Sequence, residues 1–323
     1  GQGKLSVLDL SQARIVVGGG PYFYYFKGNP TDGYSRKLYV DENDVLGDYM
    51  FCGCSALTSL TLPSSVTKIG NYAFEYCSGL TSMKIPFSVT SIGGSAFNGC
   101  SGLTSLVIPS GVTEIGVGAF SDCSGLTSLV IPSGVTKIGG GAFSGCSGLT
   151  SLVIPSGVTE IDNGAFSGCS GLTSMKIPSG VTEIGDYAFE NCSGLTSMKI
   201  PSSVTHIGYC AFKGCSGLTS LVISSGVIGS SAFENCSGLT SLIMSSGVTS
   251  IGSSAFKNCS GLTSLVIPSG VTKIGYYAFE NCSGLTSIYV YAEQIYTIGL
   301  VAFKGCDKNN CKVYVPKGTY DYY

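Results

Sequence analysis

The sequence is organised around residues 101–123, which read SGLTSLVIPSGVTEIGVGAFSDC. Close copies of this stretch precede and follow it, and each copy ends in Ala-Phe, two variable residues and Cys, except that Met50-Phe51 precedes Cys54. These cysteines lie 23 residues apart over most of the chain, at positions 54, 77, 100, 123, 146, 169, 192 and 215, and then at 236, 259, 282 and 306. A fixed period of roughly 20–50 residues is typical of a solenoid, in which each repeat forms one rung.

The first half of the repeat predicts a short strand. Leu106 and Ile108 alternate with Ser105 and Val107, so the first pair is expected to face the core and the second pair to face away from it. Pro109 should end this strand, because proline has no N–H group to donate to a neighbouring strand.

The second half predicts another short extended segment and a turn. Val112 and Ile115 place two more apolar side chains toward the core. Gly116 suits a backbone position with a positive φ, and Asp162 occupies the same repeat position. The Ala-Phe-x-x-Cys ending is too short for more than one turn of 3₁₀- or α-helix.

Stacked repeats can bury columns of identical side chains that a single repeat would leave exposed. We therefore expect one continuous repeat solenoid, a right-handed β-solenoid or horseshoe of the leucine-rich-repeat type with short strands and short 3₁₀ or helical turns. Its expected parts are a divergent first repeat and capping segment over residues 1–49, regular repeats over 50–306, and a capping strand and tail over 307–323.

Two segments of this plan are open to a second interpretation. The aromatic run Tyr22–Phe26 is either part of the N-terminal cap or a patch that contacts a ligand. The repeat between Cys215 and Cys236 is two residues short after Val227, which is either a functional kink or ordinary drift of the repeat.

The chain has 15 cysteines, and the twelve in the repeat column are expected to be reduced, buried, small apolar residues. Disulfides between successive rungs are the alternative, although parallel side chains in register do not easily reach the required dihedral angle. Cys306 and Cys311 could close a small loop. One cysteine per rung with no adjacent histidine fits no zinc ligand spacing, so no metal site is expected.

Composition narrows the functional class. Only 11% of the 323 residues are charged and the formal net charge is −2, which gives no electrostatic footprint for nucleic acid. No apolar run approaches the roughly 20 residues of a membrane-spanning helix. No export signal follows Gly1, and we expect that the sequence has been trimmed.

No group of residues predicts catalysis or a cofactor. His206 and Cys210 are four residues apart in a segment that is not helical, so a catalytic dyad is not implied. One repeat position carries Glu114, Glu160 and Glu183 in some rungs and lysines or His206 in others. We interpret this row as a solvated face of mixed charge, with acid–base chemistry or calcium binding as the alternative. We expect no enzyme and no cofactor.

The outward position of the first strand offers a candidate ligand-binding site. Its residues should form a straight row of exposed β-branched side chains interrupted by lysines, and exposed apolar surface of this kind often marks an interaction site. Packing between neighbouring strands is the competing explanation. The candidate residues are Val107, Val130, Val153, Lys176, Lys199, Val222 and Tyr289.

The consensus Leu-Thr-Ser-Leu-x-Ile-Pro-Ser-Gly-Val-Thr-x-Ile-Gly-x-x-Ala-Phe-x-x-Cys resembles the BspA-like leucine-rich repeat, also called the Treponema pallidum type. The resemblance covers about residues 50–306, and both flanks look like those of Bacteroides-type members. It implies a secreted or cell-surface protein of a host-associated microbe. The implied function is adhesion to host matrix or cell-surface proteins, or to surface components of other microbes.

We therefore expect a non-enzymatic adhesion or recognition module that acts as a monomer. The alternative is a structural spacer or stalk that presents another domain and binds nothing itself. A spacer should have a uniformly polar face, whereas the row of valines favours binding.

Overall fold

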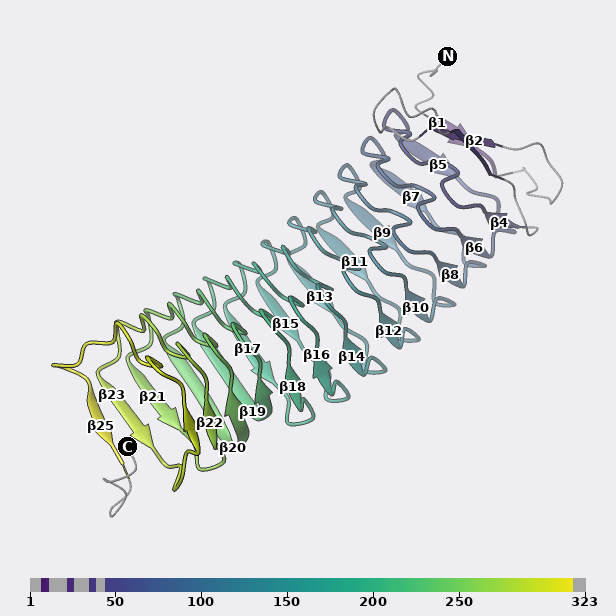
Figure 1. The fold of residues 1–323 in the computed structure, drawn as a ribbon. Coiled ribbons are helices and arrows are strands. Elements are labelled where there is room, and N and C mark those ends of the chain that lie inside the picture. The colour runs from purple at the N-terminus through teal and green to yellow at the C-terminus, as the bar shows by residue number, and fades with distance from the viewer. Residues whose placement is uncertain (1–6, 12–21, 26–34, 39–43, 316–323) are drawn as a thin grey trace. The chain divides into compact units, whose positions relative to one another are not determined.

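The computed structural model describes residues 7–11, 22–25, 35–38 and 44–315. It divides into two compact units, Gly1–Leu149 and Thr150–Tyr323, and in each unit the rungs contribute two series of parallel strands (Figure 1). The predicted parallel β-solenoid with rungs of about 23 residues is confirmed in both units, and no helix occurs among the described residues.

In the first unit, the two series lie in step, so that residues 23 positions apart face each other, as Leu106 and Leu129 do. The first series is β1 (Val7–Asp9), β5 (Ser59–Thr61), β7 (Ser82–Lys84), β9 (Ser105–Val107) and β11 (Ser128–Val130). The second is β4 (Val45–Leu46), β6 (Lys68–Ile69), β8 (Ser91–Ile92), β10 (Glu114–Ile115) and β12 (Lys137–Ile138). An antiparallel hairpin of β2 (Tyr22–Tyr25) and β3 (Ser35–Leu38) interrupts the pattern.

The second unit also contains two series of parallel strands. The first series is β13 (Ser151–Val153), β15 (Ser174–Lys176), β17 (Ser197–Ile200), β21 (Ser264–Ile267), β23 (Ser287–Val290) and β25 (Lys312–Tyr314). The second is β14 (Glu160–Ile161), β16 (Glu183–Ile184), β18 (His206–Ile207), β22 (Lys273–Ile274) and β24 (Thr297–Ile298). The division of the chain at residues 49 and 306 stays a prediction.

Two rungs of the second unit merge their two strands into one, forming β19 (Ser220–Ile228) and β20 (Ser241–Ile251). In both rungs a serine, Ser224 or Ser245, stands at the position that Pro201 and Pro268 occupy in the flanking rungs. A serine keeps its N–H group, so the backbone can stay extended through this position. The sequence predicts two short strands in each of these rungs, whereas the structure has one long strand. The replacement of proline by serine explains this difference.

The short repeat is absorbed within β19. Its pairing with β20 shifts register once between Ile223 and Ser225 and again between Gly226 and Val227. The two residues that this repeat lacks are therefore missing at two separate places, one residue at each. The sequence alone suggests a single gap after Val227. Gly226, at φ 95°, lies opposite the buried Val248, so the inward position normally held by valine carries no side chain in this rung.

The turn segment is a run of overlapping β-turns. Between Gly93 and Cys100, the N–H groups of Ala96, Asn98 and Cys100 each donate to the carbonyl three residues earlier. The N–H groups between them point to the next rung, as Phe97 N–H does toward Ala119 O at 2.8 Å. Because every second N–H group bonds across rungs, a continuous 3₁₀- or α-helical turn cannot form.

Gly116 has no positive φ, contrary to the sequence-based expectation, and neither has Asp162. The left-handed positions lie nearby, at Gly118 (φ 62°) in the same rung and Ser95 (φ 51°) in the rung before it. Glycine is favoured at position 116 because the backbone of the preceding rung is close. A Cβ atom there would lie 2.8 Å from Gly93 C and 2.9 Å from Gly93 O.

Phenylalanine rings form a stacked column in the core of each unit. Ring centroids are 5.1–5.6 Å apart from Phe51 to Phe143 and 4.9–5.4 Å apart from Phe166 to Phe303, with planes within 14° of parallel. The predicted aromatic column is thus confirmed within each unit.

The cysteine column runs beside the rings and makes a hydrogen bond that the sequence does not reveal. Ten of the column thiols donate to the carbonyl of the phenylalanine in the preceding rung, as Cys100 Sγ does to Phe74 O at 3.1 Å. The same carbonyl accepts the N–H of Cys77 in its own rung, also at 3.1 Å. Ten column cysteines are buried, whereas Cys54 at one end is exposed and Cys306 at the other is half-buried. All fifteen are free thiols.

Candidate functional site

The outward row of the first unit lies on the strand face, as the repeat pattern predicts. Val107 of β9 and Val130 of β11 are in register and are 65% and 67% exposed. The leucines that alternate with them, such as Leu106, are buried. Two neighbouring rungs therefore present apolar side chains to solvent above a closed core.

In the second unit the row begins with an apolar residue and becomes basic. Val153 of β13 is 80% exposed and lies in register with the exposed Lys176 of β15. The exposed Lys199 of β17 lies in register with Val222. Val222 is half-buried, because Lys199 and the larger Ile243 flank it in the adjacent strands.

Tyrosines end the row of the second unit. Tyr289 of β23 is in register with Tyr314 of β25, and their rings stack at a centroid distance of 4.7 Å. The sequence-based candidates thus fall into one group on each unit.

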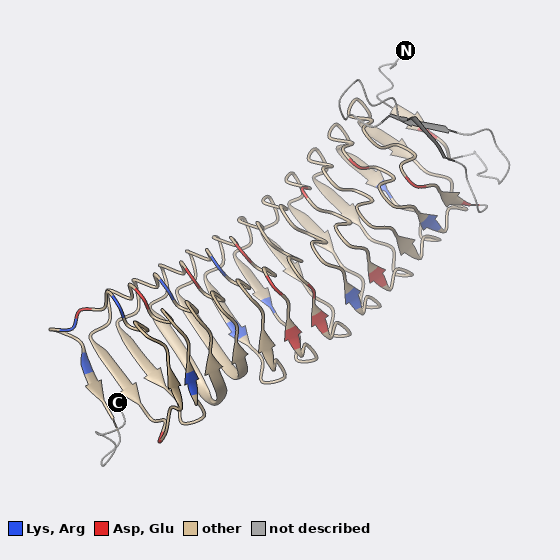
Figure 2. Ribbon diagram, viewed as in Figure 1, with Lys and Arg blue, Asp and Glu red and all other residues tan. Residues whose placement is uncertain are grey.

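The second series of strands carries the mixed charges. Figure 2 shows both signs on these strands in each unit, and Lys137 pairs with Glu114 at 3.2 Å with both side chains well exposed. Glu183 lies in register with His206. No set of three or more His, Cys, Asp and Glu side chains within the described ranges could hold a metal ion. The row has the geometry of a solvated face.

His206 and Cys210 are not arranged as a nucleophile and its base. His206 is exposed on β18, whereas Cys210 is buried in the following turn. Burial raises the pKa of the Cys210 thiol, and Tyr209 is its hydrogen-bonding neighbour. A protonated, buried thiol is a poor nucleophile.

A groove on the first unit is a feature that the sequence analysis missed. It has a volume of about 540 Å³ and lies over β5, β7 and β9, with Thr61, Lys84 and Val107 from the outward row along it. Phe87 lines one side and is 74% exposed. Between Pro63 and Pro268, all the remaining repeat prolines are followed by serine, whereas Pro86 is followed by Phe87. This departure was the available signal in the sequence.

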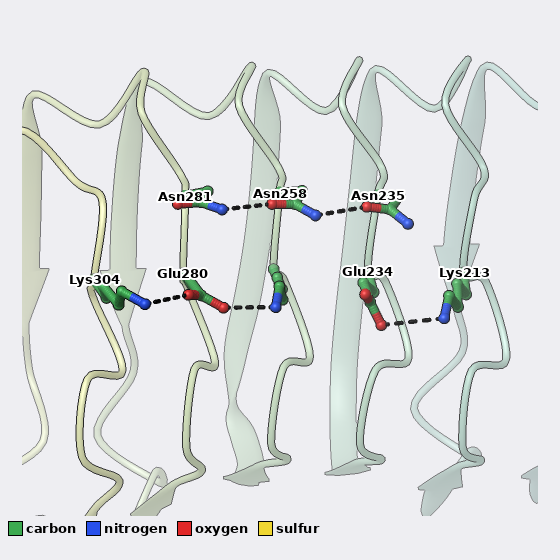
Figure 3. A network of polar contacts seen from close by, with 8 residues as sticks. Lys213, Glu234, Asn235, Asn258, Glu280, Asn281 and Lys304 are labelled. Carbon is green, nitrogen blue, oxygen red and sulfur yellow. Dashed lines mark hydrogen bonds and ion pairs between the residues drawn. The ribbon is translucent and has the colours of Figure 1, made fainter.

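A polar ladder follows the turn segments of the second unit (Figure 3). Lys257 and Lys304 flank Glu280 at 2.7 and 3.3 Å, and these two lysines lower the pKa of its carboxyl group. Lys213 pairs with Glu234 at 3.4 Å. Beside them, Asn281 donates to Asn258 at 2.9 Å and Asn258 donates to Asn235 at 2.8 Å. These contacts join neighbouring rungs and leave no open site.

Several sequence-based predictions concern residues that cannot be compared in full. The side chains of the run Tyr22–Phe26 and the tail 316–323 lie outside the described residues. Over the ranges that are described, no helix is long and apolar enough to cross a membrane.

The family model for the BspA type leucine rich repeat region matches in six copies, over residues 44–173, 136–237 and 220–320. Among solved structures, a leucine-rich repeat protein from Bacteroides ovatus is 28% identical, with a TM-score of 0.55, covering 94% of this chain and 100% of that one. A leucine rich cell surface protein from Faecalibacterium prausnitzii is also 28% identical, with a TM-score of 0.54, covering 99% and 90%.

The pneumococcal vaccine antigen PcpA, at 18% identity and a TM-score of 0.56, is similar in fold alone, and the alignment covers 97% of this chain and 79% of that one. None of the curated proteins compared with the sequence matches it. The matched repeats extend from residue 44 to residue 320, which is well over half of the sequence. The chain therefore belongs to the BspA-type leucine-rich repeat family.

Proposed function

We propose that this chain is a non-enzymatic adhesion or recognition module of a secreted or cell-surface protein. It binds host matrix or cell-surface proteins, or surface components of other microbes, through the outward row of its first strands. The observation that carries this proposal is the exposure of Val107 and Val130 on the first unit and of Val153 on the second, each on a strand whose alternate side chains are buried in the core.

The physical properties of this face suit a protein ligand. Exposed β-branched residues in register offer apolar area that a partner can cover. Their backbone is fixed by hydrogen bonds to the neighbouring rungs, so little conformational entropy is lost on binding. Lys176 and Lys199 add positive charge on the second unit, which favours an acidic partner and accelerates association.

The relatives support the proposed location. The Faecalibacterium prausnitzii protein is described as a cell surface protein, and the alignment covers nearly all of the present chain. No enzymatic activity is named for the similar structures above. The description of this relative supports a recognition module at the cell surface.

The test begins with a binding screen of the purified chain against immobilised matrix proteins and glycans. For a ligand that binds, the double variant Val130→Thr with Val153→Thr should weaken binding with little loss of stability, because threonine keeps the β-branched shape that strands favour. Val117→Thr is the matched control, since Val117 is 65% exposed in a turn segment away from the strand face.

Charge is tested separately. Lys176→Gln with Lys199→Gln should mainly slow association and flatten its dependence on salt. If a confirmed ligand binds both double variants as it binds the parent, the row is only packing between strands. If no ligand binds the parent at all, the spacer is the better description.

A further inference from the structure

The groove over β5, β7 and β9 has a floor of polar and apolar side chains in rows. Serines from three successive rungs, Ser59, Ser82 and Ser105, are among the residues that line it. Neighbouring strands are about 4.8 Å apart, so the three rungs span about 10 Å, the length of roughly three extended residues. The groove therefore matches a short extended peptide segment in length and offers hydrogen-bonding groups along its course.

Phe87 makes this groove different from the corresponding surface of the other rungs. Phe87 is 74% exposed at a position that is otherwise serine in the rungs from Pro63 to Pro268. An exposed aromatic ring beside a concave surface is a typical anchor for a partner's apolar side chain.

Lys84 supplies the charge of the groove. It is the only ionisable side chain among the residues that line it, and its ammonium group lies 5.5 Å from the centroid of the Phe87 ring. This cation–π contact holds the charge next to the aromatic anchor. A ligand that covers the ring is thereby presented with a positive group beside it.

We propose that this groove binds an extended acidic peptide segment that carries an aromatic side chain. The aromatic side chain packs on Phe87, a neighbouring carboxylate pairs with Lys84, and the peptide groups face the serine row. This inference rests on the proposed function in one respect, namely that the partner is a protein. It adds that the segment of the partner that is recognised is acidic and aromatic.

The probe is the blocked tripeptide Asp-Phe-Asp, titrated calorimetrically into the whole chain at low salt. Two control peptides are blocked in the same way. Asn-Phe-Asn lacks the negative charges, and Asp-Ala-Asp lacks the aromatic ring. Phe87→Ser restores the residue of the other rungs and should weaken Asp-Phe-Asp roughly tenfold or more, because the probe's ring loses its apolar contact.

Lys84→Val introduces valine, the residue that stands at the equivalent position of the next rung, Val107. It should weaken Asp-Phe-Asp by up to about fivefold, as expected for one solvent-accessible ion pair, and leave Asn-Phe-Asn unchanged. Val117→Thr is the control that should change nothing.

Unchanged binding of Asp-Phe-Asp to Phe87→Ser would overturn the inference, and so would its failure to bind the parent. Equal binding of Asn-Phe-Asn and Asp-Phe-Asp to the parent would overturn the requirement for acidic residues. These results would not contradict the proposed function, because that function is tested by the binding of whole matrix proteins to the parent and to the Val130 and Val153 variants.

Discussion

The buried thiol column predicts that the protein loses stability steeply at alkaline pH. Burial raises the pKa of both Cys100 and Cys282 to about 12, and it raises the pKa of Cys123, Cys192 and other column thiols as well. A cysteine in an unfolded chain has a pKa of about 8.5. Because the folded pKa is the higher one, the folded chain retains protons that the unfolded chain releases. The stabilisation is complete below pH 8.5 and is lost as the pH rises toward about 12.

The size of the effect follows from linkage. At pH 10 an unfolded thiol lies about 1.5 pH units above its pKa, so each buried thiol lowers the free energy of unfolding by about 2 kcal/mol relative to neutral pH. Five adjacent rungs that unfold together would lose about 10 kcal/mol, which is comparable with the whole stability of many domains. A thiolate would also lose the hydrogen bond that Cys100 donates to Phe74 O.

The assay is urea unfolding followed by far-ultraviolet circular dichroism between pH 7 and pH 10.5, with a reductant present throughout. The free energy of unfolding should be nearly constant up to about pH 8 and then fall with a slope that counts the thiols in the cooperative unit, about 1.4 kcal/mol per pH unit for each thiol. Cys123→Ala removes one of these protons and should reduce the slope by that amount. An unfolding midpoint that stays constant to pH 10.5, or a slope that Cys123→Ala does not change, would refute this explanation.

Three further outcomes test the packing. Thiol titration of the denatured, unreduced chain should find all twelve column cysteines free, and a smaller number would mean that some of them are bridged. Phe166→Ala should cost roughly 3–5 kcal/mol of unfolding free energy, since Phe166 is fully buried and stacked on Phe189, whereas Ser167→Ala should cost little; equal melting temperatures would place Phe166 outside a packed interior. Gly116→Ala should destabilise the fold because its Cβ atom would meet Gly93, while Gly134→Ala, with its nearest atom at 3.6 Å, should be neutral or stabilising by about 0.4–1 kcal/mol in the same unfolding assay. A similar loss in both glycine variants would contradict the close-contact argument.

The sequence predicts the columns of this fold well because the repeat determines them many times over. From a single copy of the repeat it would be uncertain which residues face the core. The residues equivalent to Phe120 and Cys123 recur in rung after rung, and this recurrence identifies them as inward positions. Stacking then follows, because identical side chains from successive rungs must meet in the core.

Other features depend on contacts between rungs that the pattern does not encode. Gly116 could serve either a positive φ or a close approach, and only the distance to Gly93 distinguishes the two. The deletion near Val227 could be placed only once the register of β19 against β20 was known. The thiol hydrogen bonds depend on where the preceding phenylalanine carbonyl points.

The candidate site was predicted in part for a similar reason. Alternation along the strand correctly places Val107 and Val130 outside the core, although it cannot show how deeply Val222 lies between its neighbours. Phe87 was visible in the sequence as the one departure from serine after a repeat proline between Pro63 and Pro268. Its meaning required the groove beside it, which is formed by three rungs together.

The polar ladder of the second unit solves a problem that near-identical rungs create. The apolar columns would fit almost equally well if a segment of chain were displaced by one whole rung, or if a rung were exchanged with that of another molecule. Lys213, Glu234, Lys257, Glu280 and Lys304 reverse sign at every step, so a displacement by one rung brings like charges together, including at the buried Glu280. A displacement by two rungs restores opposite charges. The ladder therefore distinguishes odd from even misalignments, and any misfolded or swapped forms of this unit should be offset by an even number of rungs.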